Sequence, residues 1–247
     1  MTIRAVVRVL AMAMLLLMCL PIWAISRLFC DGAFMVRFFL GRVGWLLGLR
    51  VTVRGQPVAG NVLYASNHLS WLDIPAIGGT TPARFIAKSE IAGWSVIGWL
   101  ARIGGSVFVA RQKRSETREQ ANAVSVALTE GRPVVLFAEG GTGDGVTLTP
   151  FRPSLFAAAN EAGVKVQPLA VDYGSRASEI AWPTGAGFAR ELKRMLNRPA
   201  PVRVTLHFMA PINGAEVDRK SIAREAYRAV SGALGIAEPA MPEKLAD

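Results

Sequence analysis

The sequence predicts an α/β domain that follows a pair of membrane-associated helices. Two observations carry this prediction. Short apolar runs alternate with helix-like stretches from residue 51 onward, and the first 50 residues are both apolar and rich in arginine. Such alternation is typical of α/β domains, whose chemistry lies in the loops at the strand ends. With 247 residues, of which 51% are hydrophobic, the chain can bury a large core and is not intrinsically disordered.

The net charge of the chain, +10 from 28 Lys and Arg against 18 Asp and Glu, predicts an anionic partner, either a nucleic acid or a phospholipid surface. Six of these ten charges lie within residues 1–60, where seven arginines accompany one aspartate. Nucleic-acid-binding segments are basic and polar, whereas this one is basic and apolar. The distribution therefore favours an anionic membrane surface and argues against a nucleic-acid partner. Two Cys and two His exclude a disulfide scaffold and a His-rich metal site.

The N-terminal segment begins with an uncharged stretch, Val9–Ser26, which as a helix would be about 27 Å long, close to the thickness of a hydrocarbon core. A second apolar stretch, Leu28–Leu49, is interrupted by arginines and glycines and is typical of an interfacial helix. A cleaved signal peptide is the alternative, but the apolar character continues beyond Ala24, where no good small-residue cleavage site occurs. We therefore expect residues 1–50 to form a membrane anchor, as a hairpin that dips into one leaflet.

From residue 51 the predicted strands and helices follow in alternation. Apolar and β-branched runs predict strands at Val51–Val53, Asn61–Ala65, Arg84–Ala87, Ser106–Ala110, Pro133–Phe137, Val164–Val171 and Val202–Phe208. The stretches between them predict helices near Trp71–Ile77, Trp94–Arg102, Glu116–Thr129, Ser154–Glu161, Gly187–Leu196 and Ser221–Leu234. The last dozen residues, with two prolines and mixed charge, predict a flexible tail.

The segment Asn67–Asp73 holds the first candidate site. His68 follows a predicted strand, and Asp73 lies five residues later, about one turn into the next predicted helix. At this spacing the carboxylate can fold back on the imidazole, fix its tautomer and stabilise the imidazolium that forms when the other ring nitrogen takes a proton. Because the chain has no G-x-S-x-G nucleophile elbow, the hydroxyl that completes such a triad would come from a substrate. The alternative is a helix-capping region without catalytic function.

Three further segments combine apolar strands with functional-looking ends. One strand ends in Glu139 and is followed by four glycines within six residues, which leaves backbone N–H groups open to a ligand. No lysine follows, which excludes a phosphate-binding P-loop. Another strand delivers Arg111 into a basic loop, where its guanidinium can bind a phosphate or a carboxylate. The third contains Pro168, which we expect to break that strand near its end. Taken singly, the first segment is better explained as a glycine-rich hairpin and the second as a solvated basic loop, and the third is uninformative by itself.

Together, and in this order, the four segments resemble the four sequence blocks of the glycerolipid acyltransferase family, which includes the 1-acylglycerol-3-phosphate acyltransferases. The likeness covers residues 55–210 or thereabouts. The His-x4-Asp block matches His68 and Asp73, and the remaining blocks match Gly105, Phe108 and Arg111, then Phe137, Glu139 and Gly140, and loosely the stretch around Pro168. Membrane-bound bacterial members of the family also carry a basic, apolar pair of N-terminal helices.

The resemblance implies a single acyltransferase domain over residues 51–235, with a central mixed sheet flanked by helices, and a flexible tail over residues 236–247. It implies that His68, oriented by Asp73, acts as general base on the free hydroxyl of a membrane lysolipid. That hydroxyl then attacks the thioester of an acyl-carrier protein or acyl-CoA, and no metal or other cofactor is needed. Because these donors are made in the cytosol, we place the catalytic domain on the cytoplasmic face of a bacterial inner membrane.

The resemblance also implies which residues bind the acceptor. The residues that would contact its headgroup are Arg111, Glu139, Gly140 and Thr142, and those that would support the site are Asn67, Gly105, Phe108 and Pro168. Phosphate-accepting members continue the third block as Glu-Gly-Thr-Arg, whereas Gly-Gly-Thr follows the glutamate here and the arginine is missing. This form, together with Ala87–Trp94, looks closer to the lyso-ornithine lipid acyltransferases, whose acceptor carries a carboxylate and an amine but no phosphate.

We therefore expect a lyso-ornithine lipid as acceptor, with 1-acyl-sn-glycerol-3-phosphate, which would give phosphatidic acid, as the alternative. The alternative stays open because Arg111 is retained and Arg152 could supply the lost charge. Two alternatives lie outside acyl transfer to a lipid: a thioester hydrolase that uses the same His68 and Asp73 on water, and a non-catalytic membrane lipid-binding module. Free fatty acid without esterified lipid would indicate the hydrolase, and lipid-dependent activity that survives His68→Ala would indicate the binding module.

Overall fold

The computed structural model describes residues 2–109, 117–182, 185–199 and 201–237. Arg111 lies outside these residues, as does nearly all of the expected tail. Within them, eight strands form one sheet in the order β1-β7-β6-β2-β5-β3-β4, with β8 paired to β6. The strands are β1 (Leu49–Arg54), β2 (Val62–Ser66), β3 (Arg84–Lys88), β4 (Val107–Val109), β5 (Val134–Phe137), β6 (Lys165–Asp172), β7 (Val202–Phe208) and β8 (Ile212–Asn213).

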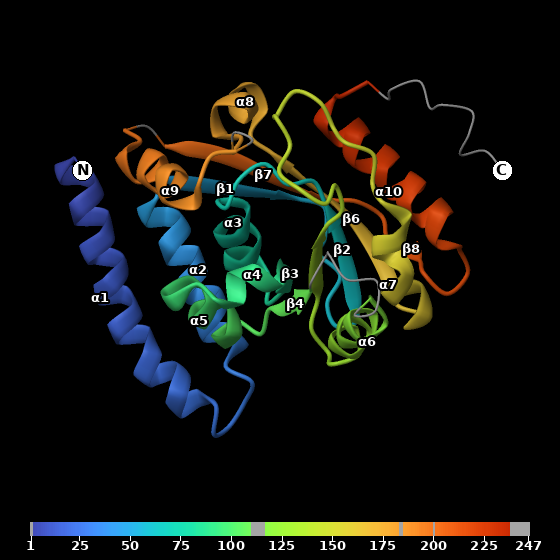
Figure 1. Cartoon of the computed structure of the whole chain (residues 1–247), viewed down its shortest axis with the longest axis horizontal. Helices are drawn as coiled ribbons and strands as arrows, with labels where there is room; N and C mark the ends of the chain where they lie inside the picture. Colours follow the sequence, from blue (N-terminus) through green and yellow to red (C-terminus); the bar gives the residue numbers. More distant parts are fainter. Residues whose placement is uncertain (1, 110–116, 183–184, 200, 238–247) are drawn as a thin grey trace.

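The sheet is mixed, as expected, and helices cover both of its faces. All pairs are parallel except β6–β7 and β6–β8, which are antiparallel. One face carries α1 (Ile3–Ser26), α2 (Ala33–Leu46), α3 (Asp73–Thr80) and α9 (Phe188–Asn197). The other carries α6 (Thr117–Leu128), α7 (Ala157–Glu161) and α10 (Arg219–Leu234), and Figure 1 shows these two groups on opposite sides of the sheet. Shorter elements lie around the rim: α4 (Ser89–Ala92), α5 (Ser95–Ile103), α8 (Ala177–Ile180) and the 3₁₀ helices η1 (Pro153–Phe156) and η2 (Gly174–Arg176).

Two buried clusters form because side chains alternate across the strands. In β2, Val62 and Tyr64 belong to the core beneath α3, whereas Leu63 and Ala65 belong to the core beneath α10. A strand with buried residues on both faces requires a continuous apolar run, and β2 is buried along its whole length. The β2–β5–β6 centre of the sheet is therefore a rigid support for the loops that follow these strands.

Pro168 does not break its strand, contrary to the expectation from sequence. It lies in the middle of β6, opposite Ala65 of β2. The Pro168 carbonyl accepts a hydrogen bond from the Met209 N–H (3.1 Å). In an antiparallel pair, a residue with an N–H at position 168 would also donate to the Met209 carbonyl, and proline cannot. The side-chain amide of buried Gln167 supplies that donor instead, at 2.9 Å from the Met209 oxygen. The strand continues because its neighbour replaces the hydrogen bond that proline cannot make.

The N-terminal helices lie along the domain as a packed pair (Figure 1). Near the start of α1, the Arg8 guanidinium donates to the carbonyls of Leu196 and Arg198 at the C-terminal end of α9, both at 2.9 Å. At the turn between α1 and α2, Asp31 pairs with Arg132 of the domain at 3.4 Å. By length and composition α1 could cross a membrane. The expected boundary at residue 50 falls within β1, which runs from Leu49 to Arg54.

Candidate active site

The carboxyl ends of β2 and β5 bring the first and third sequence blocks together. Ser66 of β2 lies opposite Phe137 of β5, and the ladder continues through a 2.9 Å hydrogen bond from the Ala138 N–H to the Ser66 carbonyl. His68 and Glu139 therefore leave neighbouring parallel strands at the same level. This edge of a parallel sheet is where α/β proteins place their binding sites.

Asn67 fixes the start of the loop that carries the histidine. Its side-chain amide donates to the carbonyl of Val171 in β6 (3.1 Å) and accepts from the N–H of the same residue (2.8 Å). Asn67 is 1% exposed, so both hydrogen bonds are shielded from water. This paired contact extends the β2–β6 ladder by one residue and sets the point at which the chain turns away from the sheet.

His68 and Asp73 form the pair that their spacing predicts. Nδ1 of His68 lies 2.7 Å from Oδ2 of Asp73. Since the carboxylate is only an acceptor, Nδ1 carries the proton, and Nε2 of the neutral ring is left with a free lone pair. No other group in the described part of the chain bonds to Nε2, and 17% of the His68 side chain is exposed to solvent. The geometry is that of a histidine held ready to accept a proton.

Asp73 is the first residue of α3 rather than a residue one turn into the helix, which corrects the expectation from sequence. The preceding residues form a turn, so that Oδ2 also accepts from the N–H groups of Leu69 (2.8 Å) and Ser70 (3.0 Å). Oδ1 accepts from the hydroxyl of Tyr173 at 2.6 Å. Four donors thus satisfy a carboxylate whose side chain is wholly buried, which is the condition under which a buried charge is tolerated.

Tyr173 is a site residue that the sequence analysis missed. It follows β6, some 100 residues away from Asp73 in the chain, and is 4% exposed. Burial, together with the adjacent Asp73 carboxylate, raises the pKa of Tyr173 well above its ordinary value, so the hydroxyl stays protonated and remains a donor. Only the β2–β6 register places it there, and no local pattern in the sequence signals that contact.

Phe137 has a role that its place in the third block did not reveal. Its ring stacks on the imidazole of His68, with ring centroids 3.8 Å apart and an angle of 14° between the planes. The backbone of the histidine is held as well, because the Gly143 N–H donates to the His68 carbonyl at 2.7 Å. The ring is therefore fixed by a hydrogen bond at one edge and an aromatic face on one side.

Glu139 uses both carboxylate oxygens on backbone groups of the site. Oε1 accepts from the N–H of His68 (2.8 Å), and Oε2 accepts from the N–H of Thr149 (3.0 Å). Burial raises the pKa of Glu139, and these two hydrogen bonds act in the opposite direction. Glu139 thus ties the histidine loop to the far end of the glycine-rich loop, residues 140–150.

The glycine-rich loop carries two further expected residues. Gly140 has a φ of +81°, a backbone conformation that favours glycine, and a β-carbon on it would lie 3.1 Å from Nε of the exposed Arg152 side chain. Thr142 is partly exposed in the same loop. Arg152 therefore lies beside Gly140 of the third block.

The second block lies apart from the histidine. Gly105 (φ +76°) follows Gly104, the C-cap of α5, and Phe108 lies in β4 at the edge of the sheet, with the Arg102 guanidinium 5.9 Å from its ring centroid. Two strands, β5 and β3, separate β4 from β2. Pro168 likewise lies within the sheet and not at its edge. The structure therefore brings together Asn67, His68, Asp73, Glu139, Gly140 and Thr142, but not Gly105, Phe108 and Pro168.

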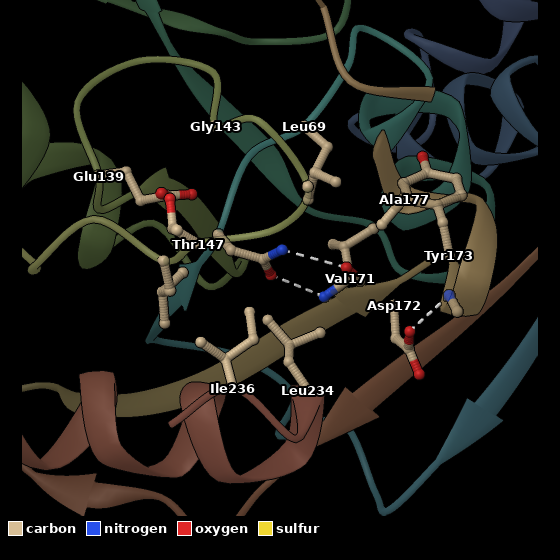
Figure 2. Close-up of a pocket in the computed structure, with 14 residues that line it drawn as sticks. Leu69, Glu139, Gly143, Thr147, Val171, Asp172, Tyr173, Ala177, Leu234 and Ile236 are labelled. Carbon is tan, nitrogen blue, oxygen red and sulfur yellow. Dashed lines mark hydrogen bonds between the residues drawn. The ribbon is translucent and has the colours of Figure 1, made fainter. Parts of the chain in front are cut away.

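A cavity of about 130 Å³ lies beside the histidine loop, where Asn67 and Leu69 line it. Figure 2 shows Glu139 and Thr147 on one side of it and Leu234 and Ile236, from the end of α10, on the other. His68 is not among the residues that line this cavity, and its ring instead stacks on Phe137. A substrate must reach Nε2 from the exposed side of the ring.

The fold is similar to that of a solved acyltransferase. A solved structure, the 1-acyl-sn-glycerophosphate acyltransferase PlsC from Thermotoga maritima, superimposes with a TM-score of 0.64 at 20% identity, over 94% of this chain and 100% of that one. The family model described as Acyltransferase matches residues 50–172, which include the histidine, the aspartate and the glycine-rich loop.

Curated relatives extend the match to most of the chain. A lyso-ornithine lipid O-acyltransferase from Pseudomonas aeruginosa is 33% identical over 86% of this chain and 83% of its own length. Another from Brucella abortus is 37% identical over 76% of each chain. A 1-acyl-sn-glycerol-3-phosphate acyltransferase from Neisseria gonorrhoeae is 39% identical over 51% of this chain and 50% of its own length. The chain therefore belongs to the acyltransferase family, and it is an enzyme that transfers an acyl group to a lysolipid.

Proposed function

We propose that the enzyme transfers a fatty acyl group from acyl-carrier protein or acyl-CoA to the free hydroxyl of a lyso-ornithine lipid, at the cytoplasmic face of a bacterial inner membrane. The observation that carries the catalytic part is the 2.7 Å contact between Nδ1 of His68 and buried Asp73, in a partly exposed histidine whose Nε2 has no hydrogen-bond partner among the described residues. No metal or other cofactor enters the proposed reaction.

In the proposed reaction, Nε2 of His68 removes the proton from the acceptor hydroxyl as its oxygen attacks the thioester carbonyl carbon. Asp73 stabilises the imidazolium that forms. The tetrahedral intermediate then collapses, the C–S bond breaks, and the departing sulfur takes the proton from His68, so that acylated lipid and free thiol leave a neutral histidine behind. General-base help of this kind is worth about 10²–10⁴-fold, and positioning of the two substrates supplies more.

The choice of acceptor rests on the third block and on the relatives. The arginine that follows Glu-Gly-Thr in phosphate-accepting members is absent, and two relatives that match 86% and 76% of this chain, at 33% and 37% identity, are named for lyso-ornithine lipid. Arg152, which lies against Gly140, is the observation that favours 1-acyl-sn-glycerol-3-phosphate instead. It is exposed and could offer its guanidinium to a phosphate. Acceptor binding by Arg111, Glu139, Gly140 and Thr142 remains part of the proposal.

Membrane attachment is proposed on the anchor helices. In α1, an 18-residue window has a mean hydropathy of 2.4 and is only 11% buried within the protein. Because both the start of α1 and the turn before α2 are tied to the domain, we propose that the pair lies in one leaflet alongside the catalytic domain. The catalytic face is placed at the cytoplasm because the acyl donors are made there.

A labelled acyl donor, supplied in parallel with lyso-ornithine lipid and with 1-acylglycerol-3-phosphate, tests the proposal. We expect labelled ornithine lipid as the main product and its loss in His68→Ala. Preferred labelling of phosphatidic acid, abolished by Arg152→Gln, would assign the other acceptor. Labelled free fatty acid without esterified lipid would overturn the transferase assignment and indicate a hydrolase.

A further inference from the structure

Helix α5 leaves most of its own apolar surface uncovered. Gly98 is the only buried residue among the nine of this helix. The exposed fractions of its large side chains, and of the tryptophan that precedes it, are 58% for Val96, 37% for Ile97, 39% for Trp99 and 38% for Trp94. A helix that is apolar around most of its circumference is normally buried, and a contiguous exposed apolar patch marks an interaction surface.

This surface adjoins the anchor helices. Gly104, which caps α5, lies against α2, because a β-carbon on it would be 3.8 Å from Cγ1 of Val36. Figure 1 shows α5 beside α2, with α1 beyond it. The anchor helices and their turn expose further large apolar side chains, among them Leu28, Phe29, Phe34 and Phe38. Apolar side chains thus extend from α1 across α2 to α5.

The charges on these helices are of one sign. None of the three helices contains Asp or Glu, whereas Arg37 and Arg42 of α2 and Arg102 of α5 are exposed. Apolar and aromatic side chains with arginines among them are the composition of an element that lies in the interface of an anionic bilayer.

We propose that α5, together with Trp94, is a second membrane contact that inserts into the lipid interface beside the anchor. The partner is an anionic phospholipid surface, chosen for the continuity with α1 and α2 and for the exposed arginines of helices that themselves contain no Asp or Glu. An aromatic chain joins this contact to the histidine loop. Phe188 lies 4.9 Å from Trp94 and 6.4 Å from Trp71 between ring centroids, and Trp71 lies between His68 and Asp73 in sequence. Seating α5 in the bilayer would thereby hold the exposed edge of His68 close to the lipid surface.

A fluorescent probe tests this contact without reference to activity. The full chain, with Cys19→Ser and Cys30→Ser, would carry an environment-sensitive fluorophore on the thiol introduced by Ile97→Cys. The protein would be reconstituted in vesicles of one part phosphatidylglycerol to three parts phosphatidylethanolamine. We expect blue-shifted emission and quenching by lipids brominated in the acyl chain. The control is the same label at position 126, because Val126 in α6 is also an exposed apolar residue (57%) and should stay in water.

Emission at position 97 that matches the water-exposed control would overturn the proposal. A blue shift without quenching by brominated lipid, lost when the protein is diluted in the bilayer, would also overturn it and indicate a contact between copies of the chain.

An acyl-transfer assay, which rests on the proposed function, gives the second readout. Val96→Glu with Ile97→Glu should lower transfer to vesicle-embedded lysolipid by about tenfold or more, but leave transfer in detergent micelles within about twofold. Val126→Glu should change neither, and an equal loss in vesicles and micelles would contradict a membrane role.

Discussion

At the scale of single residues, Asp73 has the largest number of partners in the site, and they serve two purposes. The backbone N–H groups of Leu69 and Ser70 donate to the Asp73 carboxylate and so fix the shape of the loop. His68 also contacts this carboxylate, and its imidazolium form needs the negative charge of Asp73 for stabilisation. An asparagine can turn its oxygen toward these three donors and its NH₂ toward Tyr173, whose hydroxyl can accept. The shape of the loop would then survive while the charge is lost.

Asp73→Asn should therefore separate catalysis from folding. We expect kcat to fall by about 100-fold or more, because an uncharged partner stabilises the imidazolium poorly, with KM for the lysolipid within a few-fold of wild type. Tyr173→Phe keeps the charge and removes one donor, so its kcat should fall by less than about tenfold. Steady-state kinetics and thermal unfolding of both variants make the comparison. Turnover of Asp73→Asn near that of wild type would show that the aspartate is only structural.

The raised pKa of Glu139 predicts how the stability of the folded protein depends on pH. Its raised pKa means that the folded protein holds this proton more tightly than the unfolded chain does. The resulting stability is fully present below the ordinary value near 4.5 and is lost as the pH rises through the raised folded value. Relative to Glu139→Gln, which does not titrate, wild type should gain stability as the pH is lowered from 8 toward 5. The measurement is the Tm of wild type minus the Tm of Glu139→Gln at each pH, and we expect this value to rise as the pH is lowered. A value that falls toward pH 5 would contradict the buried placement.

The residues of the site were predictable from sequence to different degrees. His68 and Asp73 are five positions apart, and the short turn between them brings their side chains into contact, so their spacing was sufficient. Tyr173 and the stacking of Phe137 on His68 depend on the register between strands that are distant in the chain, and no spacing encodes that register.

At the scale of elements, α2 and α3 approach so closely that backbone meets backbone. A β-carbon on Gly79 would lie 2.5 Å from the α-carbon of Gly41, whereas one on Gly41 would find its nearest neighbour at 3.5 Å. The two glycines of one contact are thus not equivalent. This closeness matters for the site because α3 begins at Asp73.

Gly79→Ala should lower the free energy of unfolding by about 1–3 kcal/mol, since the clash is with backbone that cannot rotate away. Gly41→Ala is the matched control and should change it by less than about 1 kcal/mol, because the contact there is an ordinary one and alanine favours a helix. Denaturant unfolding of the two variants in detergent gives both values. Equal losses would show that the helices are not packed in this asymmetric way.

Elements were predictable where a run of apolar residues is long and buried. The strand expected at Val202–Phe208 has those bounds in the structure, and the other expected strands lie within about two residues of the observed ones as far as the chain is described. The interior position of Pro168 was not predictable, because it depends on Gln167 supplying a hydrogen bond to Met209, a residue of another segment. The rim helices α4 and α8 are four residues each, too short to show a helical period.

At the scale of the whole molecule, the two anchor helices have different relations to the domain. Helix α2 packs on α3, leads directly into β1 and contributes Ala33, Met35 and Gly44 to the interior. Helix α1 buries only Ala5 and Cys19 and touches the domain mainly along α2 and α9. The anchor expected over residues 1–50 therefore combines a peripheral helix with one that belongs to the fold.

Two truncations should separate these roles. Removal of residues 1–31 leaves α2 and β1 intact, so we expect a cooperative thermal transition and unimpaired acyl transfer to lysolipid in detergent micelles. Binding to anionic vesicles should fall by about tenfold or more, because most of the apolar surface of α1 is gone. Removal of residues 1–50 also strips α2 from α3 and cuts two residues from β1, and we expect it to abolish the cooperative transition. If the longer truncation unfolded cooperatively and stayed active in micelles, α2 would be an appendage like α1, and the packing of Gly79 on Gly41 would not help to position Asp73.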